Sequence, residues 1–244
     1  MASAGERLSS ARSMLELPAT GVGALTTALA IAILVAVAVP IARRRQINLY
    51  VAHIQRILDV PPGKGVDLPV EIMPHLLLGD KRCAADLPTL SAFGITHMLN
   101  VAGTHGRAAS GAAHVGALHY LQLHADDDEG YPILTKHLLA ASAFIRTARE
   151  QGGRVLIHCQ AGINRSGCIA VAELMLTERL PVLEAIQRVK AARGVLLSNT
   201  SFQRQLVELA RDNGLLGPLP ADLPVAAARF KPRARSAADA LRRL

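Results

Sequence analysis

Short apolar segments alternate with helical patterns between residues 67 and 215, and this alternation predicts one α/β domain. Four segments bounded by Gly or polar residues have the character of strands: 76–78, 97–101, 118–123 and 154–158. Apolar residues at spacings of three and four indicate a helix from Leu134 to Ala148. Two further helices are expected, because Pro181 and either Asn199 or Ser201 can open them, and Gly194 and Gly214 can end them.

The composition narrows the class of protein. The chain has 244 residues, of which 50% are hydrophobic, so it can bury a core and is not a disordered polymer. Three cysteines are too few, and odd in number, for a disulfide scaffold, which indicates a reducing compartment or a thiol that reacts. Aromatic residues make up 3% and Trp is absent, so few aromatic side chains are available on which nucleic-acid bases could stack.

The net charge of +8 is confined to the two ends of the chain. Residues 1–66 carry seven Lys/Arg against three Asp/Glu, residues 67–215 carry fourteen of each, and residues 216–244 carry six against two. A basic flank serves a membrane surface or a mobile tail more often than a specific nucleic-acid site. We therefore expect no nucleic-acid partner.

The N-terminal region contains a long run without charge. Residues 17–42 hold no charged side chain, and 21–42 are 22 mostly aliphatic positions. At about 1.5 Å per residue this helix would cross the roughly 30 Å hydrocarbon core of a bilayer. A buried helix is disfavoured because the run has no polar face, and a cleaved signal peptide because its leader lacks a basic segment. The run therefore predicts a single membrane span.

The segments on either side of this span complete the domain organisation. Arg43, Arg44 and Arg45 follow it directly, and this positive flank predicts that everything after it lies in the cytosol. Ile47, Tyr50, Ile54 and Leu58 then share one helical face, which suits either an interfacial helix or a spacer. The expected organisation is a tail (1–16), a transmembrane helix (17–42), a juxtamembrane linker or helix (43–66), the folded domain (67–215) and a basic flexible tail (216–244).

Chemistry-bearing residues concentrate at 155–167, VLIHCQAGINRSG, which is an apolar strand, a Gly-containing loop and the start of a helix. Such a loop can turn successive backbone N–H groups inward and add the positive end of a helix dipole, so it suits a phosphate. Arg165 adds a planar fork of donors for two phosphate oxygens. The same field lowers the pKa of Cys159 and favours a thiolate nucleophile. Ser166 can hydrogen-bond this sulfur, and His158 can hold the loop through backbone groups.

This loop resembles the protein-tyrosine-phosphatase signature H-C-x5-R-S/T, and its surroundings resemble the dual-specificity branch of those enzymes. The similarity runs over about residues 68–211 and includes EIMPHLLLGD (71–80), GITHMLNVA (94–102) and LLSNTSFQRQL (196–206). It implies a mostly parallel central sheet flanked by helices, no cofactor, and a cysteinyl-phosphate intermediate. It also implies that the phosphate binds to the loop residues Gln160, Ala161, Gly162, Ile163, Asn164 and Arg165.

The resemblance also implies a general acid in HYLQLHADDDEG (119–130). In the family the acid lies seven residues after the Tyr that is Tyr120 here, which selects Asp127. Asp126 and Asp128 flank it, so the register can shift by one. Tyr120 itself is expected in the core, and Asn199 is expected either to brace the phosphate-binding loop or to serve only as a helix N-cap.

Other cysteines and histidines complete the candidate residues. Cys83 or Cys168 could trap oxidised Cys159 as a disulfide, but buried, inert cysteines are expected at both positions. The histidines show no paired ligand spacing, so no metal is expected. The small-residue loop 103–116 has no counterpart in the family.

A phosphorylated protein is the substrate that this pattern favours. Positions 160–164 hold no Lys or Arg, which argues against a polyanionic lipid, and the neutral domain argues against RNA. We expect a membrane-anchored enzyme that accepts phospho-Tyr and phospho-Ser/Thr. The alternatives are a phosphatase of a lipid or RNA phosphate and a phosphate-binding adaptor without turnover.

Overall fold

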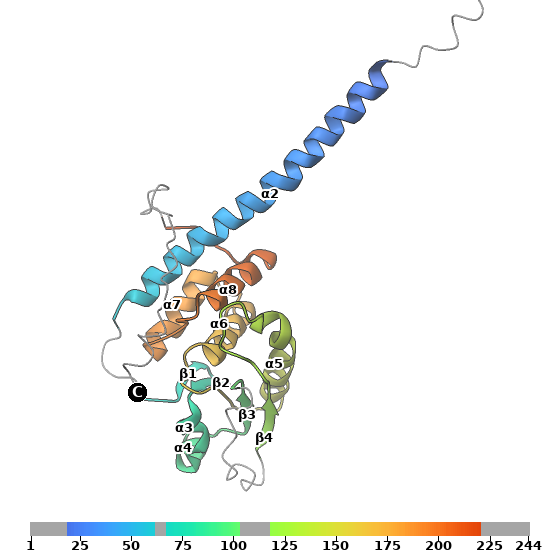
Figure 1. Ribbon diagram of the computed structural model, residues 1–244. Coiled ribbons are helices and arrows are strands. Elements are labelled where there is room, and N and C mark those ends of the chain that lie inside the picture. The colour runs from blue at the N-terminus through green and yellow to red at the C-terminus, as the bar shows by residue number, and fades with distance from the viewer. Residues whose placement is uncertain (1–18, 62–66, 103–117, 221–244) are drawn as a thin grey trace, which may run out of the picture. The chain divides into compact units, whose positions relative to one another are not determined.

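The computed structural model describes residues 19–61, 67–102 and 118–220, without the side chains of 19–28, 30 and 31 (Figure 1). The chain divides into two compact units, Met1–Gln46 and Ile47–Leu244. The predicted N-terminal tail, the loop 103–116 and the part of the basic tail after residue 220 lie outside the described residues.

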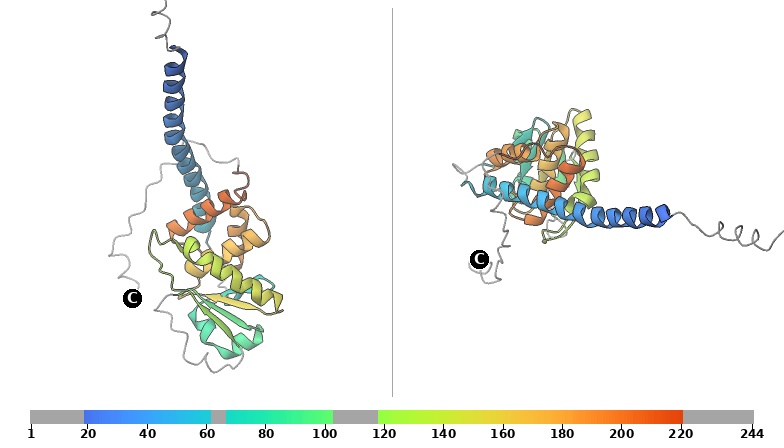
Figure 2. Two further views of the ribbon diagram at one scale, coloured as in Figure 1. Left: turned by 90° about the vertical axis from the view of Figure 1, so that its right-hand side faces the viewer. Right: turned by 90° about the horizontal axis from the view of Figure 1, so that it is seen from above.

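Five strands in the second unit form one mixed sheet, in the order β1-β2-β5-β3-β4 (Figure 2). The strands β2, β5, β3 and β4 run parallel, whereas β1 pairs antiparallel with β2. The expected α/β fold is therefore confirmed. The bounds are β1 (Val70–Met73), β2 (Leu76–Gly79), β3 (His97–Asn100), β4 (His119–Gln122) and β5 (Val155–His158).

The strand β1 was not predicted as a separate element. Pro74 and His75 form a turn after Met73, and they divide 71–80 into two antiparallel strands. Proline favours such a turn because its φ is fixed and it has no N–H to contribute to a sheet. Beyond this turn, the ends of β2 and β3 lie on either side of β5, with Gly79 and Asn100 in register with His158.

Successive residues of the central strands point to opposite faces of the sheet and build two cores. Leu76, Leu78, Leu99, Val155 and Ile157 belong to the larger core, while Leu77, Met98 and Leu156 belong to the smaller one. The larger core is covered by α5 (Ile133–Glu150) and α6 (Arg165–Thr177), the smaller by α3 (Lys81–Ala85) and α4 (Leu87–Ala92) (Figure 1). The alternation follows from the two-residue period of a strand.

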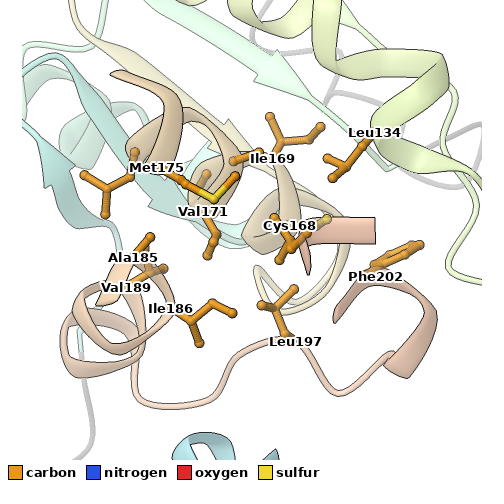
Figure 3. Packing of buried hydrophobic residues seen from close by; sticks show 14 of the residues in the cluster. Leu134, Cys168, Ile169, Val171, Met175, Ala185, Ile186, Val189, Leu197 and Phe202 are labelled. Carbon is orange, nitrogen blue, oxygen red and sulfur yellow. The ribbon is translucent and has the colours of Figure 1, made fainter. Parts of the chain in front are cut away.

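Helix α6 occupies the centre of the larger core. Every residue from Arg165 to Met175 is buried, and α6 packs against α5, α7 (Val182–Arg193) and α8 (Thr200–Asp212). Figure 3 shows Cys168 of α6 among side chains that include Leu134, Leu197 and Phe202. Both predicted C-terminal helices are confirmed: α7 ends at Gly194, whose φ is +80°, and α8 begins after Asn199 rather than Ser201.

The last third of helix α2 (Ala19–Asp59), from Ile47 onward, is part of the second unit. Ile47, Tyr50, Val51 and Ile54 are at most 6% exposed and belong to the larger core. The hydroxyl of Tyr50 also donates a hydrogen bond to the carbonyl oxygen of Gly217. Neither of the two alternatives, an interfacial helix or a spacer, describes this face, because the folded domain covers Ile47, Tyr50 and Ile54.

The N-terminal part of α2 includes most of the predicted span, residues 17–42. Among the residues whose side chains the structure describes, no helix is both long and apolar enough to cross a membrane. Much of the predicted segment 17–42 lies outside that set, namely residues 17 and 18 and the side chains of 19–28, 30 and 31.

Candidate active site

Residues 159–165, here the Cys159 loop, connect the end of β5 to the start of α6. The loop turns at Gly162, whose φ is +64°. A Cβ atom on Gly162 would lie 2.4 Å from the carbonyl oxygen of Gly79 in β2. Only glycine combines this left-handed conformation with so close an approach of two backbones.

Cys159 is 2% exposed at the base of this loop. The Ser166 hydroxyl donates to its sulfur over 3.2 Å. Burial by itself raises the pKa of Cys159. The hydrogen bonds from the Ser166 side chain and from the backbone N–H groups of Ser166 and Ile163, with the positive charge of Arg165, outweigh burial and lower the pKa overall. The site therefore favours a thiolate.

Arg165 is the first residue of α6, and its guanidinium is held from two sides. Nη1 donates to the carbonyl oxygens of Ala102 (2.9 Å) and Ala125 (3.2 Å). Nε lies 3.6 Å from Oδ2 of Asp127, although the two residues are 38 positions apart. The fold thus brings the predicted cation and the predicted acid into direct contact.

The carboxyl group of Asp127 lies against the Cys159 loop. Its side chain accepts hydrogen bonds from the amides of Asn164 (Oδ2, 3.4 Å) and Asn199 (Oδ1, 3.4 Å). Burial raises the pKa of Asp127, and this effect outweighs the lowering by Asn199, Arg165 and Asn164. A raised pKa keeps the carboxyl protonated to higher pH, as a proton donor requires.

Asp126 and Asp128 are exposed neighbours in the same acidic loop, residues 126–129. The contacts with Arg165, Asn164 and Asn199 are made by the side chain of Asp127. Asp128 contributes its backbone carbonyl, which accepts from the Asn199 amide at 3.3 Å. The geometry therefore favours Asp127 among the three predicted candidates.

Asn199 connects three parts of the site. Its side-chain oxygen caps α8 by accepting from the N–H groups of Ser201 and Phe202. Its amide donates to the acidic loop, and its backbone N–H donates to Asn164 Oδ1 in the Cys159 loop. The side chain of Asn199 thus caps α8 and bonds the acidic loop, while its backbone N–H makes the contact with the Cys159 loop.

The structure also shows where two further predicted residues, His158 and Tyr120, lie. His158 is 3% exposed, its Nδ1 lies 3.3 Å from the carbonyl oxygen of Cys159, and burial lowers its pKa to about 4. Tyr120 is 40% exposed, so the prediction that it lies in the core is wrong. Its hydroxyl is at the edge strand β4, where it accepts from the amide of Asn100.

The remaining cysteines are buried, free thiols. Cys168 has no exposed surface, and burial raises its pKa. Burial also raises the pKa of Cys83, which lies beside Asp80. Both thiols are therefore buried, as expected, and their raised pKa disfavours the reactive thiolate form. In the described part of the chain, no cluster of three or more His, Cys, Asp or Glu side chains is arranged to hold a metal ion.

Two residues at the site were missed from the sequence. The carboxylate of Glu129 accepts from the backbone N–H groups of Thr200 and Ser201, at 3.1 Å each. The guanidinium of Arg193 donates to the carbonyl oxygens of Ala161 (2.8 Å) and Gly162 (3.0 Å). A basic residue in the last turn of a helix ordinarily indicates only an interaction with the helix dipole, so the sequence carried no separate signal for Arg193.

Comparisons with known proteins agree with this geometry. The family described as "Dual specificity phosphatase, catalytic domain" matches residues 76–212. The chain is 39% identical over 142 residues to bovine (Bos taurus) dual specificity protein phosphatase 26, covering 58% of this chain and 66% of that protein. It is 42% identical to mouse (Mus musculus) dual specificity protein phosphatase 2, covering 58% and 42% of the two chains. The matches thus span less than two thirds of either relative.

A solved structure has the same fold. The crystal structure of human DUSP28 superposes with a TM-score of 0.54 at 28% identity, covering 62% of this chain and 99% of that one.

Proposed function

Because this chain belongs to the family of dual-specificity phosphatase catalytic domains, we propose that it hydrolyses phosphate monoesters on Tyr and on Ser or Thr of protein substrates. The observation that carries the proposal is the convergence of four side chains: Cys159 just after β5, Arg165 and Ser166 at the start of α6, and Asp127 in the acidic loop. The Cys159 thiol has a lowered pKa, Ser166 donates to its sulfur, and Arg165 contacts the carboxyl of Asp127.

The first chemical step uses the thiolate as nucleophile. Cys159 Sγ attacks phosphorus, an S–P bond forms, and the ester P–O bond breaks. The Arg165 guanidinium and the N–H groups of the Cys159 loop bind the non-bridging oxygens, where charge is concentrated. Asp127 transfers its proton to the leaving oxygen, so that an alcohol rather than an alkoxide departs.

The second step releases phosphate. Asp127, now a carboxylate, accepts a proton from the attacking water, and the S–P bond of the cysteinyl phosphate breaks. The Ser166 hydroxyl, which donates to Cys159 Sγ over 3.2 Å, stabilises the departing thiolate. The products are inorganic phosphate and the regenerated enzyme. The cycle requires no cofactor.

Protein phosphoesters are favoured over lipids or RNA for two reasons. Positions 160–164 of the Cys159 loop contain no Lys or Arg that would pair with further phosphates of a phosphoinositide. The relatives that match the chain are named as dual specificity protein phosphatases. An adaptor without turnover is disfavoured because Cys159, Arg165 and Asp127 are all present and lie together.

We also propose that residues 17–42 anchor the chain in a membrane, with the catalytic domain in the cytosol. The proposal rests on the uncharged run and on the Arg triplet that follows it. The exposed large apolar side chains of α2 between Leu29 and Ile41 are 48–68% exposed, which suits a lipid environment better than water.

The catalytic proposal is tested with the full chain in detergent. We expect turnover of p-nitrophenyl phosphate and of phosphotyrosyl and phosphoseryl peptides, and none with Cys159→Ser. That variant should still bind phosphopeptides, because the N–H groups and Arg165 remain. Phosphoinositides and 5′-triphosphorylated RNA are assayed in parallel, and turnover of either without turnover of phosphopeptides would contradict the proposal.

A further inference from the structure

Four consecutive carbonyl groups of the Cys159 loop are held from outside the loop. The oxygen of Gln160 accepts from the N–H of Lys81, and the oxygen of Ile163 accepts from the N–H of Leu197. The two carbonyls between them, those of Ala161 and Gly162, both accept from the side chain of Arg193. One guanidinium thus holds the middle of the loop.

The direction of these carbonyls decides where the adjacent N–H groups point. In a trans peptide the C=O and the following N–H point in opposite directions, so fixing one fixes the other. The oxygen of Gly162 shares its peptide with the N–H of Ile163, and that N–H bonds the sulfur of Cys159. The Ala161 oxygen likewise shares its peptide with the N–H of Gly162. Arg193 therefore holds the two peptides that carry the N–H groups of Gly162 and Ile163.

The position of Arg193 also lets its positive charge act on the charges of the Cys159 loop. It is partly buried at the end of α7, where Gly194 turns the chain with a φ of +80°. Burial lowers the pKa of Arg193, and the negative charges of Asp80 and, to a smaller extent, Cys159 oppose that lowering. A guanidinium can donate to two carbonyls at once from a rigid plane, which a lysine ammonium cannot reproduce.

We propose that Arg193 is a positioning residue for phosphoryl transfer, which orients the peptides 161–162 and 162–163 so that their N–H groups face the thiolate and the bound phosphate. The inference rests on the proposed function of the Cys159 loop. Arg193 acts through that loop and not by touching the substrate. Its positive charge additionally favours the thiolate form of Cys159.

The test compares Arg193→Gln and Arg193→Lys in the full chain. Arg188→Gln is the matched control, because Arg188 lies on the same helix and forms exposed ion pairs with Glu178 and Glu184 (2.8 Å each). The measurements are kcat and KM for p-nitrophenyl phosphate across pH, the inhibition constant of inorganic phosphate, and thermal unfolding. Arg193→Lys serves as the informative variant if Arg193→Gln does not fold.

For Arg193→Gln we expect kcat/KM to fall about 10²-fold, the order found when one preorganised donor to a transition state is removed. In the same variant, the inhibition constant of inorganic phosphate should rise. The acidic limb of kcat/KM should move to higher pH, because the thiolate loses a nearby positive charge. Arg193→Lys should have the acidic limb of kcat/KM at the wild-type pH but should bind phosphate more weakly. Arg188→Gln should match the wild type in both measurements.

Wild-type kinetics in Arg193→Gln would overturn the inference. The inference would also be overturned if activity fell only in proportion to thermal stability, while the acidic limb of kcat/KM and the inhibition constant of phosphate stayed unchanged. If the wild-type chain hydrolyses nothing, inorganic phosphate binding is measured directly by thermal shift. Weaker phosphate binding in Arg193→Gln then supports the inference even though the proposed function has failed, and equal binding overturns it.

Discussion

Asp127 shows how neighbouring residues of one type acquire different chemistry from their contacts. It lies between Asp126 and Asp128, and all three are carboxylic acids in an exposed loop. Only the Asp127 carboxyl is placed against Arg165, Asn164 and Asn199 in the described part of the chain. Burial raises its pKa, and a proton is therefore retained at pH values where a free aspartate has lost it.

Asp127→Asn should remove the proton donor while leaving the loop intact. We expect kcat for phosphoserine to fall by about 10²- to 10⁴-fold, because an alkoxide leaves poorly without a proton. The loss should be smaller for p-nitrophenyl phosphate, whose leaving group is a stable anion. Wild-type kcat should decline as pH rises through the raised pKa of Asp127, and this decline should vanish in the variant.

Asp126→Asn and Asp128→Asn are the matched controls, measured as kcat on both substrates across pH. Each should retain wild-type behaviour. If one of them loses the alkaline decline instead, the assignment is wrong by one position. If none of the three does, the proton comes from another loop.

At the scale of elements, the acidic loop is held against the start of α8. Glu129 accepts from two N–H groups that α8 leaves without intrahelical partners, and Asn199 donates to the carbonyls of Asp127 and Asp128. The Gln205 side chain in α8 also bonds the N–H of Leu134 and the carbonyl of Tyr131. The helix thereby positions the loop that contains the acid.

Glu129→Ala should loosen this arrangement without removing any reacting group. We expect kcat on phosphoserine to fall about tenfold, a fraction of what the acid itself supplies, and kcat on p-nitrophenyl phosphate to change less. Glu208→Ala, an exposed position on the same helix, is the control. An equal loss on both substrates would show that Glu129 affects the whole site and not the acid.

A second element, the end of α2, contributes to stability. Ile54 has no exposed surface and lies in the larger core together with Val51. Ile54→Ala should therefore lower the free energy of unfolding by about 2–5 kcal/mol, as for other large-to-small core changes. Arg56→Ala, an exposed position two residues later, should change it by less than about 0.5 kcal/mol.

This stability prediction is measured by denaturant unfolding of the full chain. Equal midpoints for the wild type and Ile54→Ala would mean that the end of α2 does not pack on the domain in solution. The result also bears on fragment design. A catalytic fragment that starts at residue 60 would lack Ile47, Tyr50, Val51 and Ile54, which are buried in the larger core.

At the scale of the whole molecule, the chain combines a charge-balanced catalytic domain with two basic flanks. Residues 67–215 carry equal numbers of acidic and basic side chains, so the net charge of +8 lies in the flanking segments. A basic segment beside an apolar run is attracted to anionic lipid headgroups on the cytosolic side of a membrane. This distribution leads to a prediction about topology.

The full chain, carrying a different epitope tag at each end, should remain in sealed membranes after alkaline extraction. Protease added on the cytosolic side should remove the C-terminal tag and spare the N-terminal one. The reason is that the flank of the span that contains Arg43, Arg44 and Arg45 is expected to stay in the cytosol. Replacing the three with Glu is the control and should weaken this orientation. Release by alkaline extraction would contradict the anchor, and protection of the C-terminal tag would contradict the orientation.

Much of the fold and the centre of the site could be predicted because the relevant information is local. A strand period of two divides Leu76, Leu77 and Leu78 between the two cores, and Gly194 and Asn199 mark helix boundaries through their own backbone preferences. Cys159, Arg165 and Ser166 lie within one short loop and helix start, so their order along the chain already brings them together. Sterics and hydrogen bonding between near neighbours are sufficient for these predictions.

The tertiary structure decided what depends on distant segments meeting. Arg193 reaches Gly162 across 31 positions, Glu129 reaches Thr200 across 71, and Tyr50 reaches Gly217 across 167. The contacts of the Asp127 carboxyl with Arg165 and Asn199, and the packing of the end of α2 on the domain, depend on the same kind of meeting. A periodic pattern shows which face of a helix is apolar, but the surface that covers this face is determined only when the elements pack together.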